Sequence, residues 1–170
     1  EIWRFSPLRA MKALLTDAAQ RVADDASIRA VVLTGAGGVF CAGGDLRGME
    51  QVRAGMTLEG WRERMQEFQP WLRALIELDR PVIAAVDGAA YGAGFGLALA
   101  ADFVLASTRA RFCLSFMRVG LGPDFGAMYT LPRVVGVQRA KELMLSAREV
   151  DAEEARRLGI AMEIVPPEAL

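Results

Sequence analysis

Residues 80–107 read RPVIAAVDGAAYGAGFGLALAADFVLAS, and the fold can be predicted from this stretch outward. It holds two short runs typical of buried strands, at residues 82–86 and 103–107. Between them, residues 92–101 are almost all small or apolar, which predicts a helix that other elements can approach closely. Strand, helix and strand in this order indicate an α/β fold with right-handed crossovers.

The rest of the chain continues this alternation. Apolar spacing predicts further helices at residues 7–25, 58–78, 125–134, 138–146 and 152–158, and further strands at residues 29–34, 111–113 and 160–165. Ser6 and Pro7 fit the N-cap and the first position of the first helix. The β-branched run within residues 29–34 suits a strand that is buried on both faces. Because the elements are short and the turns many, a stack of ββα-like coils fits as well as a doubly wound sheet.

The composition is that of a single globular domain. Of 170 residues, 53% are hydrophobic and 24% are charged, and 20 Lys and Arg nearly balance 21 Asp and Glu. No basic tract predicts nucleic-acid binding. The longest apolar stretch, residues 81–101, is broken by Asp87 and several glycines, so we expect no membrane span and, without a signal peptide, a cytoplasmic protein. Cys41 and Cys113 lack metal-ligand spacing and are expected to be reduced core thiols.

The sequence contains no histidine. This removes Ser-His-Asp and Cys-His triads, imidazole metal sites and histidine general bases together. Any acid–base chemistry must therefore come from a carboxylate, or from Lys, Tyr or Cys.

Two glycine clusters follow predicted buried strands, at residues 34–45 and 87–96. That end of an α/β sheet is where ligands usually bind. A dinucleotide site would need glycine at Phe40, and no phosphate-loop Lys-Ser or Lys-Thr pair is present. Backbone N–H groups in tight turns and at helix starts can instead stabilise the oxyanion that forms when a thioester loses its α-proton. The alternative is that these glycines only make turns and close packing.

Several ordered stretches carry a family resemblance. Residues 31–46 (VVLTGAGGVFCAGGDL), residues 80–107, residues 110–160 and the closing IVPPEAL are similar to the enoyl-CoA hydratase/isomerase (crotonase) superfamily. The resemblance implies a single domain over residues 1–170, built as a spiral of ββα repeats and lacking the family's N-terminal hairpin and C-terminal trimerisation helices. It also implies an acyl-CoA thioester as substrate, no metal or other cofactor, and a homotrimer or dimer of trimers.

The same resemblance implies the site residues. The oxyanion donors would be the backbone amides of Gly44 and Ala93. The other residues expected to contact coenzyme A or the acyl group are Ala42, Asp45, Leu46, Gly94, Phe116 and Pro123. An alternative for Asp45 is that it caps a following helix.

Two departures bear on the reaction. Hydratases of this family resemble one another in having two glutamates over the substrate double bond, and these positions fall on Gly96 and Phe116 here. The single carboxylate that remains in the neighbourhood of these two positions is Asp124. It lies in a GLGPDFG pattern similar to that of family members that shift double bonds, where the aspartate moves the proton. Apolar neighbours such as Phe95 and Phe125 would raise its pKa.

These departures predict double-bond isomerisation of an enoyl-CoA, with Asp124 as the proton shuttle. Hydration and the isomerisation of aryl-epoxide-CoA substrates stay open, as does a non-catalytic acyl-CoA-binding subunit. For Asp124 itself, the alternative is an N-cap on a helix that begins at Phe125.

Overall fold

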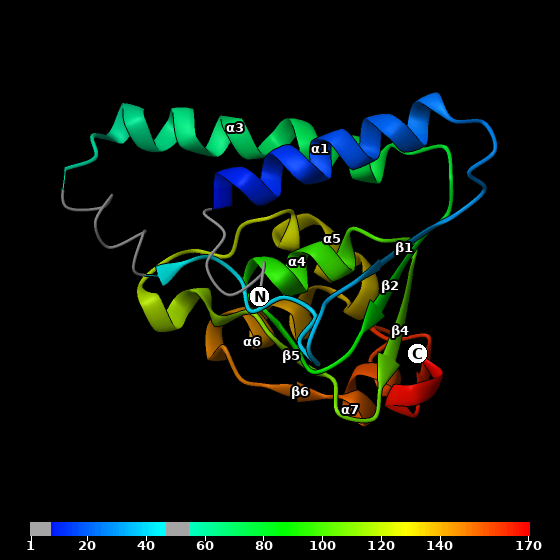
Figure 1. Ribbon diagram of the computed structural model, residues 1–170. Coiled ribbons are helices and arrows are strands. Elements are labelled where there is room, and N and C mark those ends of the chain that lie inside the picture. The colour runs from blue at the N-terminus through cyan, green and yellow to red at the C-terminus, as the bar shows by residue number, and fades with distance from the viewer. Residues whose placement is uncertain (1–7, 47–54) are drawn as a thin grey trace.

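The computed structural model describes residues 8–46 and 55–170. One sheet contains β1 (Val31–Thr34), β2 (Val82–Val86), β4 (Phe103–Ser107) and β7 (Glu163–Val165), and a second contains β3 (Ala89–Tyr91), β5 (Arg111–Cys113) and β6 (Val150–Asp151). The helices are α1 (Leu8–Asp24), α3 (Leu58–Ile76), α4 (Ala93–Leu99), α5 (Ala127–Val135), α6 (Val137–Ser146) and α7 (Ala152–Arg157), with 3-10 turns η1 (Ser115–Val119) and η2 (Pro167–Ala169). Figure 1 shows α1 and α3 side by side, with α4 between this pair and the second sheet.

Each turn of the chain adds one strand to each sheet. The first sheet is parallel throughout, in the order β1-β2-β4-β7, and the second has the order β3-β5-β6. Cys41 extends the second sheet through a parallel bridge to Ala90. The chain therefore winds as a coil of ββα repeats, which is one of the two arrangements that the sequence left open.

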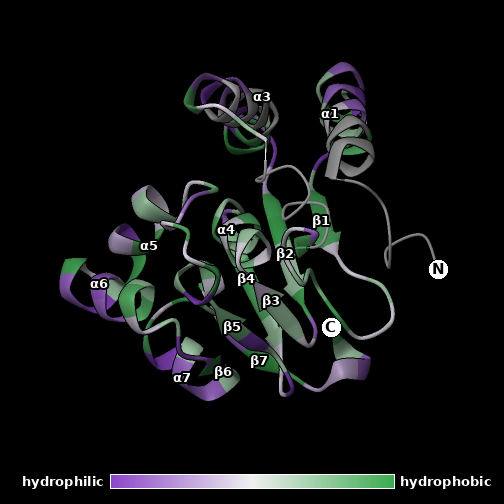
Figure 2. Ribbon diagram, turned by 90° about the vertical axis from the view of Figure 1, so that its left-hand side faces the viewer, coloured by the Kyte–Doolittle hydropathy of each residue, from purple (hydrophilic) through white to green (hydrophobic). Residues whose placement is uncertain are grey.

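The core lies between the two sheets and α4. From Gly94 to the end of α4 every residue is buried, as predicted for a run of small residues. The rings of Phe95 in α4 and Phe112 in β5 pack with their centroids 5.2 Å apart. Figure 2 shows hydrophobic colouring along β1 and β2, whereas α3 and α7 carry many hydrophilic residues. Burial of this apolar surface is the main stabilising contribution to such a fold.

Most predicted elements are confirmed. The bounds of β2, β4 and β5 agree with the sequence prediction to the residue. The strand β3 was missed because its three residues lie inside a glycine-rich stretch and resemble a turn. The proposed capping by Ser6 and Pro7 lies outside the described residues.

The prediction that the first strand is buried on both faces is wrong. β1 is the edge strand, and its residues alternate between half-buried and exposed, with Val32 64% exposed. In register with it across the sheet lie Ile83 and then Phe103, which is 45% exposed. This face of the sheet points away from α4, so the β-branched run marks a strand but not its burial.

The β2–β3 turn depends on Gly88. This residue has φ +66°, and a Cβ there would collide with the Gly38 carbonyl group of the turn after β1. Gly37 has nearly the same φ, +68°, but a Cβ there would meet no atom within 4 Å. An alanine at Gly37 would therefore suffer backbone strain alone, whereas an alanine at Gly88 would suffer the same strain and a steric collision.

We expect Gly37→Ala to lower the free energy of unfolding by about 1 kcal/mol, because a side chain disfavours a left-handed residue. Gly88→Ala should lower it by about 3 kcal/mol, since overpacking adds to the same strain. Urea unfolding of both variants beside the wild type measures the difference. Equal losses would contradict the close contact between the two turns.

Candidate active site

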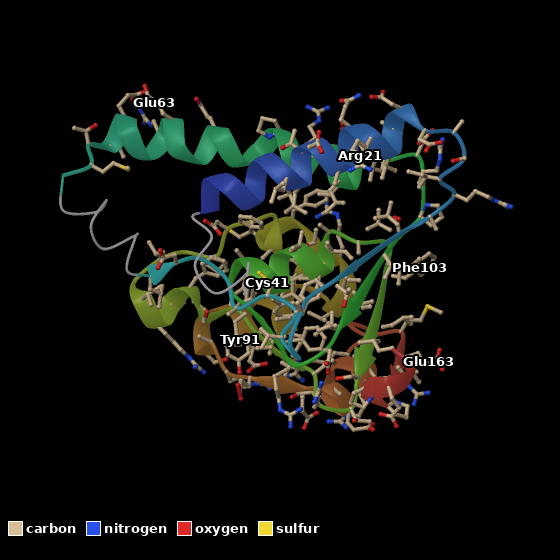
Figure 3. All side chains as sticks on the ribbon, viewed as in Figure 1. Arg21, Cys41, Glu63, Tyr91, Phe103 and Glu163 are labelled. Atoms are coloured by element: carbon tan, nitrogen blue, oxygen red, sulfur yellow. The ribbon has the colours of Figure 1, made fainter. Side chains whose placement is uncertain are left out.

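The glycine turn after Cys41 lies against the start of α4. The Cys41 N–H donates to the Ala89 carbonyl, and the Tyr91 N–H donates to the Cys41 carbonyl, each at 2.9 Å. Figure 3 shows Cys41 beside α4. Because this pairing is parallel, both segments leave it in the same direction, and the turn of residues 42–44 runs alongside the N-terminus of α4.

Two glycines allow these backbones to touch. At Gly43, which has φ +93°, a Cβ would lie 2.7 Å from the Tyr91 carbonyl oxygen and 3.7 Å from the Ala93 nitrogen. At Gly94, a Cβ would lie 2.8 Å from the Cys41 Cβ and would collide with the Cys41 carbonyl. A side chain at either position would push the turn away from α4.

This contact brings together the two amides that the resemblance singles out. Ala93 is the first residue of α4, so its N–H has no acceptor within the helix. Within residues 8–46 and 55–170, neither the Gly44 N–H nor the Ala93 N–H donates a hydrogen bond. Both residues are half-buried. The two amides therefore lie on neighbouring backbones, without an acceptor among the described residues, and are candidates for binding an oxyanion.

An ion pair fixes the strand ends beneath the turns. Asp87, which follows β2, accepts hydrogen bonds from the Arg109 guanidinium at 2.6 and 2.5 Å and from the Ser107 hydroxyl at 2.7 Å. The Arg109 bonds hold the pKa of the Asp87 carboxyl below its usual range. A Cβ at Gly38 would lie 3.1 Å from Arg109 Nη2, so the same side chain packs against the turn after β1.

The turn that carries Asp124 rests on the side of α4. A Cβ at Gly96 would lie 2.6 Å from the Phe125 carbonyl oxygen and 2.9 Å from the Phe125 Cβ. Gly96 follows Ala93 by three residues, which is about 4.5 Å along the helix axis. The turn that carries Asp124 therefore contacts α4 within one helical turn of the Ala93 amide.

Burial raises the pKa of the Asp124 carboxyl from 3.8 to about 6. Its Oδ1 atom is buried and has no hydrogen-bond partner among the described residues. The raised pKa that the apolar surroundings predicted is confirmed. The alternative that Asp124 caps a helix starting at Phe125 is wrong, because α5 begins at Ala127 and its N-cap is Gly126, with no side-chain cap.

Neither position expected for a hydratase glutamate carries one, and at residue 96 the packing leaves no room for it. Gly96 is covered by the backbone of Phe125, as described above. Phe116 is buried, and its ring tip lies 3.9 Å from the Cβ position of Gly92, at the N-cap of α4. The absence of a carboxylate at residue 96 thus follows from the packing, whereas at residue 116 a buried phenylalanine stands in its place.

The other predicted contact residues fall around this centre. Ala42, Asp45 and Leu46 are exposed along the turn, and Pro123 is half-buried beside Asp124. Asp45 precedes residues that lie outside the described part of the chain, so the capping alternative for it stays a prediction.

None of the helices in residues 8–46 and 55–170 is long and apolar enough to cross a membrane. The same residues contain no cluster of Cys, Asp and Glu able to hold a metal ion.

Sequence reasoning missed two contributors. Arg109 lies 22 residues from Asp87, and no spacing rule connects them. Phe125 has φ +55°, a left-handed conformation that costs a bulky residue about 1–2 kcal/mol, and an aromatic side chain gives no hint of it. Only the glycine that follows, Gly126, signals a turn.

The fold and these contacts define an α/β spiral in which a glycine turn and the half-buried carboxyl of Asp124 both lie against one helix, α4. A sequence model described as enoyl-CoA hydratase/isomerase matches residues 9–170. A Rhodobacter capsulatus protein named probable enoyl-CoA hydratase is 46% identical over 157 residues, which are 92% of this chain and 59% of that protein. The 1,2-epoxyphenylacetyl-CoA isomerase of Escherichia coli is 39% identical over 160 residues, 94% of this chain and 61% of its own length.

A solved structure has the same fold as this chain. The crystal structure of an enoyl-CoA hydratase/isomerase from Cupriavidus metallidurans superposes with a TM-score of 0.88 at 52% identity, over 94% of this chain and 59% of that one. The chain belongs to the enoyl-CoA hydratase/isomerase family and has its crotonase fold. It spans 59–61% of the length of these three relatives.

The raised pKa of Asp124 makes a prediction about stability. The folded pKa of about 6 exceeds the unfolded value, so the free energy of unfolding should fall as the pH rises from about 4 to about 6. Asp124→Asn removes this loss and should raise the free energy of unfolding at pH 8 by about 1–2 kcal/mol, allowing for partial solvent screening. At pH 4 the gain should vanish. Urea unfolding at the two pH values measures it.

Asp87→Asn serves as a control of opposite sign. The pKa of Asp87 is lowered in the folded state, so its stabilising contribution is present at neutral pH and disappears as the pH falls through the folded pKa. This variant should be less stable than the wild type at pH 8. An Asp124→Asn protein that is no more stable than the wild type at pH 8 would show that the carboxyl is hydrated.

Proposed function

We propose that this chain carries the catalytic centre of an acyl-CoA enzyme that shifts the double bond of an enoyl-CoA. The thioester oxygen accepts hydrogen bonds from the Gly44 and Ala93 amides. Each such donor contributes roughly 100- to 1,000-fold in rate where one has been removed by mutation. The observation that carries the proposal is the buried Oδ1 atom of Asp124, which has no hydrogen-bond partner among the described residues and belongs to a turn that packs on α4, the helix of the Ala93 amide.

The proton balance needs one carboxylate. Ionised Asp124 takes a proton from the α-carbon of a 3-enoyl-CoA, and the electron pair delocalises into a dienolate whose negative oxygen rests between the two amides. The protonated carboxyl then returns the proton to C4. The double bond moves from C3–C4 to C2–C3 without redox change, and Asp124 is ionised again.

The absent glutamates argue against hydration. Adding water to an enoyl-CoA needs an acid and a base over the double bond, and the packing at Gly96 and Phe116 holds neither. Relatives named hydratases therefore support the scaffold and the thioester more than the reaction. Isomerisation of an epoxyaryl-CoA is the second candidate, favoured by the 39% identity to 1,2-epoxyphenylacetyl-CoA isomerase. A non-catalytic acyl-CoA-binding subunit stays the alternative of another class.

Asp124→Asn should lower kcat for 3-enoyl-CoA isomerisation by at least about 1,000-fold while changing acyl-CoA affinity little, because the oxyanion donors are backbone groups. Isomerisation and exchange of α-protons into deuterated water measure the chemistry, and calorimetry measures binding. Asp17→Asn, on the exposed side of α1, is the matched control and should behave as the wild type. Turnover retained by Asp124→Asn rejects Asp124 as the proton carrier, and wild-type protein that binds without any exchange supports the non-catalytic alternative.

The pH profile gives a separate test. A base must be ionised, so kcat/KM should rise with pH through an apparent pKa of about 6 and then level off. No histidine is present to produce a limb in the same range. A profile that is flat between pH 5 and 8 would be incompatible with Asp124 acting as the base.

A further inference from the structure

The contact between Phe125 and α4 leaves no space for any side chain at residue 96. Both distances from a Cβ at Gly96, 2.6 Å to the Phe125 carbonyl oxygen and 2.9 Å to the Phe125 Cβ, are shorter than real Cβ contacts. The nearer atom belongs to the backbone, so it cannot move aside by a rotamer change. Residue 125 would have to shift as a whole.

The turn is also held from its other side. A Cβ at Gly126, which has φ +74°, would lie 3.3 Å from Leu72 Cδ2 of α3. The Ala127 N–H donates to the Asp124 carbonyl at 3.0 Å and closes the turn. Residues 124–126 are thus packed between α3 and α4, with Phe125 kept in its left-handed conformation at the contact.

The carboxyl of Asp124 depends on this packing for its position. No donor among the described residues holds its Oδ1 atom, which is nevertheless buried. A side chain without such a bond is oriented by its own backbone and by the atoms packed around it. The place where the turn meets α4 therefore sets where the carboxyl lies and how much water reaches it.

We propose that Gly96 and Phe125 act as one positioning unit for Asp124, and that this unit commits the site to proton transfer by a single carboxylate. The inference rests on the proposed function and deepens it. A carboxylate at residue 96 would displace Phe125, and with it Asp124. The two-glutamate arrangement and the Asp124 arrangement exclude each other on this backbone, so the substrates are enoyl-CoA esters whose proton moves between two carbons, not esters that add water.

Charged neighbours offer no competing explanation for the pH behaviour. Burial is the cause of the raised pKa of Asp124. α4 has no titratable side chain. The titratable groups on the elements packed around the turn include Arg73 on α3, paired with Glu77 at its C-cap, Arg118 on η1, and Arg133 stacked over Tyr129 on α5.

The test compares Gly96→Ala with Gly122→Ala in the same protein. Gly122 is a matched control because it lies only two residues before Asp124. A Cβ at Gly122 meets no atom within 4 Å, so its replacement should leave the kinetics unchanged. Gly96→Ala should lower kcat for 3-enoyl-CoA by about 10- to 100-fold, as a small misplacement of a catalytic group does, with less than about a threefold change in KM. The apparent pKa of kcat/KM should fall by about one unit as water reaches the carboxyl.

A second variant tests the other half of the unit. Phe125→Gly removes the contacting Cβ and accepts the left-handed conformation freely, so it keeps the test decisive even if Gly96→Ala does not fold. It should lower kcat and the apparent pKa in the same way, and the double variant should lose little more than either single one. Gly96→Glu should lose isomerisation and gain no hydration of a 2-enoyl-CoA.

The outcomes separate the two proposals. Wild-type kinetics in Gly96→Ala, losses that multiply in the double variant, or hydration by Gly96→Glu with isomerisation intact would each overturn the positioning unit. These results leave the proposed function standing as long as Asp124→Asn abolishes turnover. Turnover that survives Asp124→Asn overturns the proposed function itself.

Discussion

The candidate site depends on three places where two backbones approach more closely than a Cβ permits. The turn after Cys41 meets β3 and α4 at Gly43 and Gly94, and the Asp124 turn meets α4 at Gly96. Each contact joins segments that are distant in the sequence. Since interiors are packed at crystal-like density, a missing side chain at such a point fixes the distance between the segments instead of loosening it. The relative placement of two amides and one carboxylate follows from these contacts.

This arrangement has a free-energy cost. Phe125 takes a conformation that costs a bulky residue about 1–2 kcal/mol, and the Oδ1 atom of Asp124 is buried without a donor among the described residues. Stabilising contacts nearby offset that cost, among them the buried face of α4, the Phe95–Phe112 ring pair and the hydrogen bonds that Asp87 accepts from Arg109. Backbone strain at one residue beside an unpaired buried polar atom at the next is typical of functional sites.

Local sequence predicted the fold well where local physics sets the structure. The runs at β2 (VIAAV) and β4 (FVLAS) are short and mostly apolar, and each is followed at once by a polar residue, so their limits agree with the prediction to the residue. The burial of β1 could not be predicted, because it depends on which strand becomes the edge of the sheet. At the site, the glycine turns and Asp124 could be identified, whereas the contact of Gly96 with Phe125 joins positions almost thirty residues apart and follows only from the packed fold.

The glycine at residue 96 has a consequence for how this scaffold can diversify. On the present backbone, a mutation from glycine to glutamate would place a carboxylate where hydratases of the family carry one and would at the same time displace the turn of Asp124, the proposed proton carrier. A lineage moving between the two chemistries would then pass through an inactive intermediate unless the loop around residue 125 changed beforehand. Such epistasis makes the order of substitutions matter as much as their identity, and it separates the two activities by more than one mutational step.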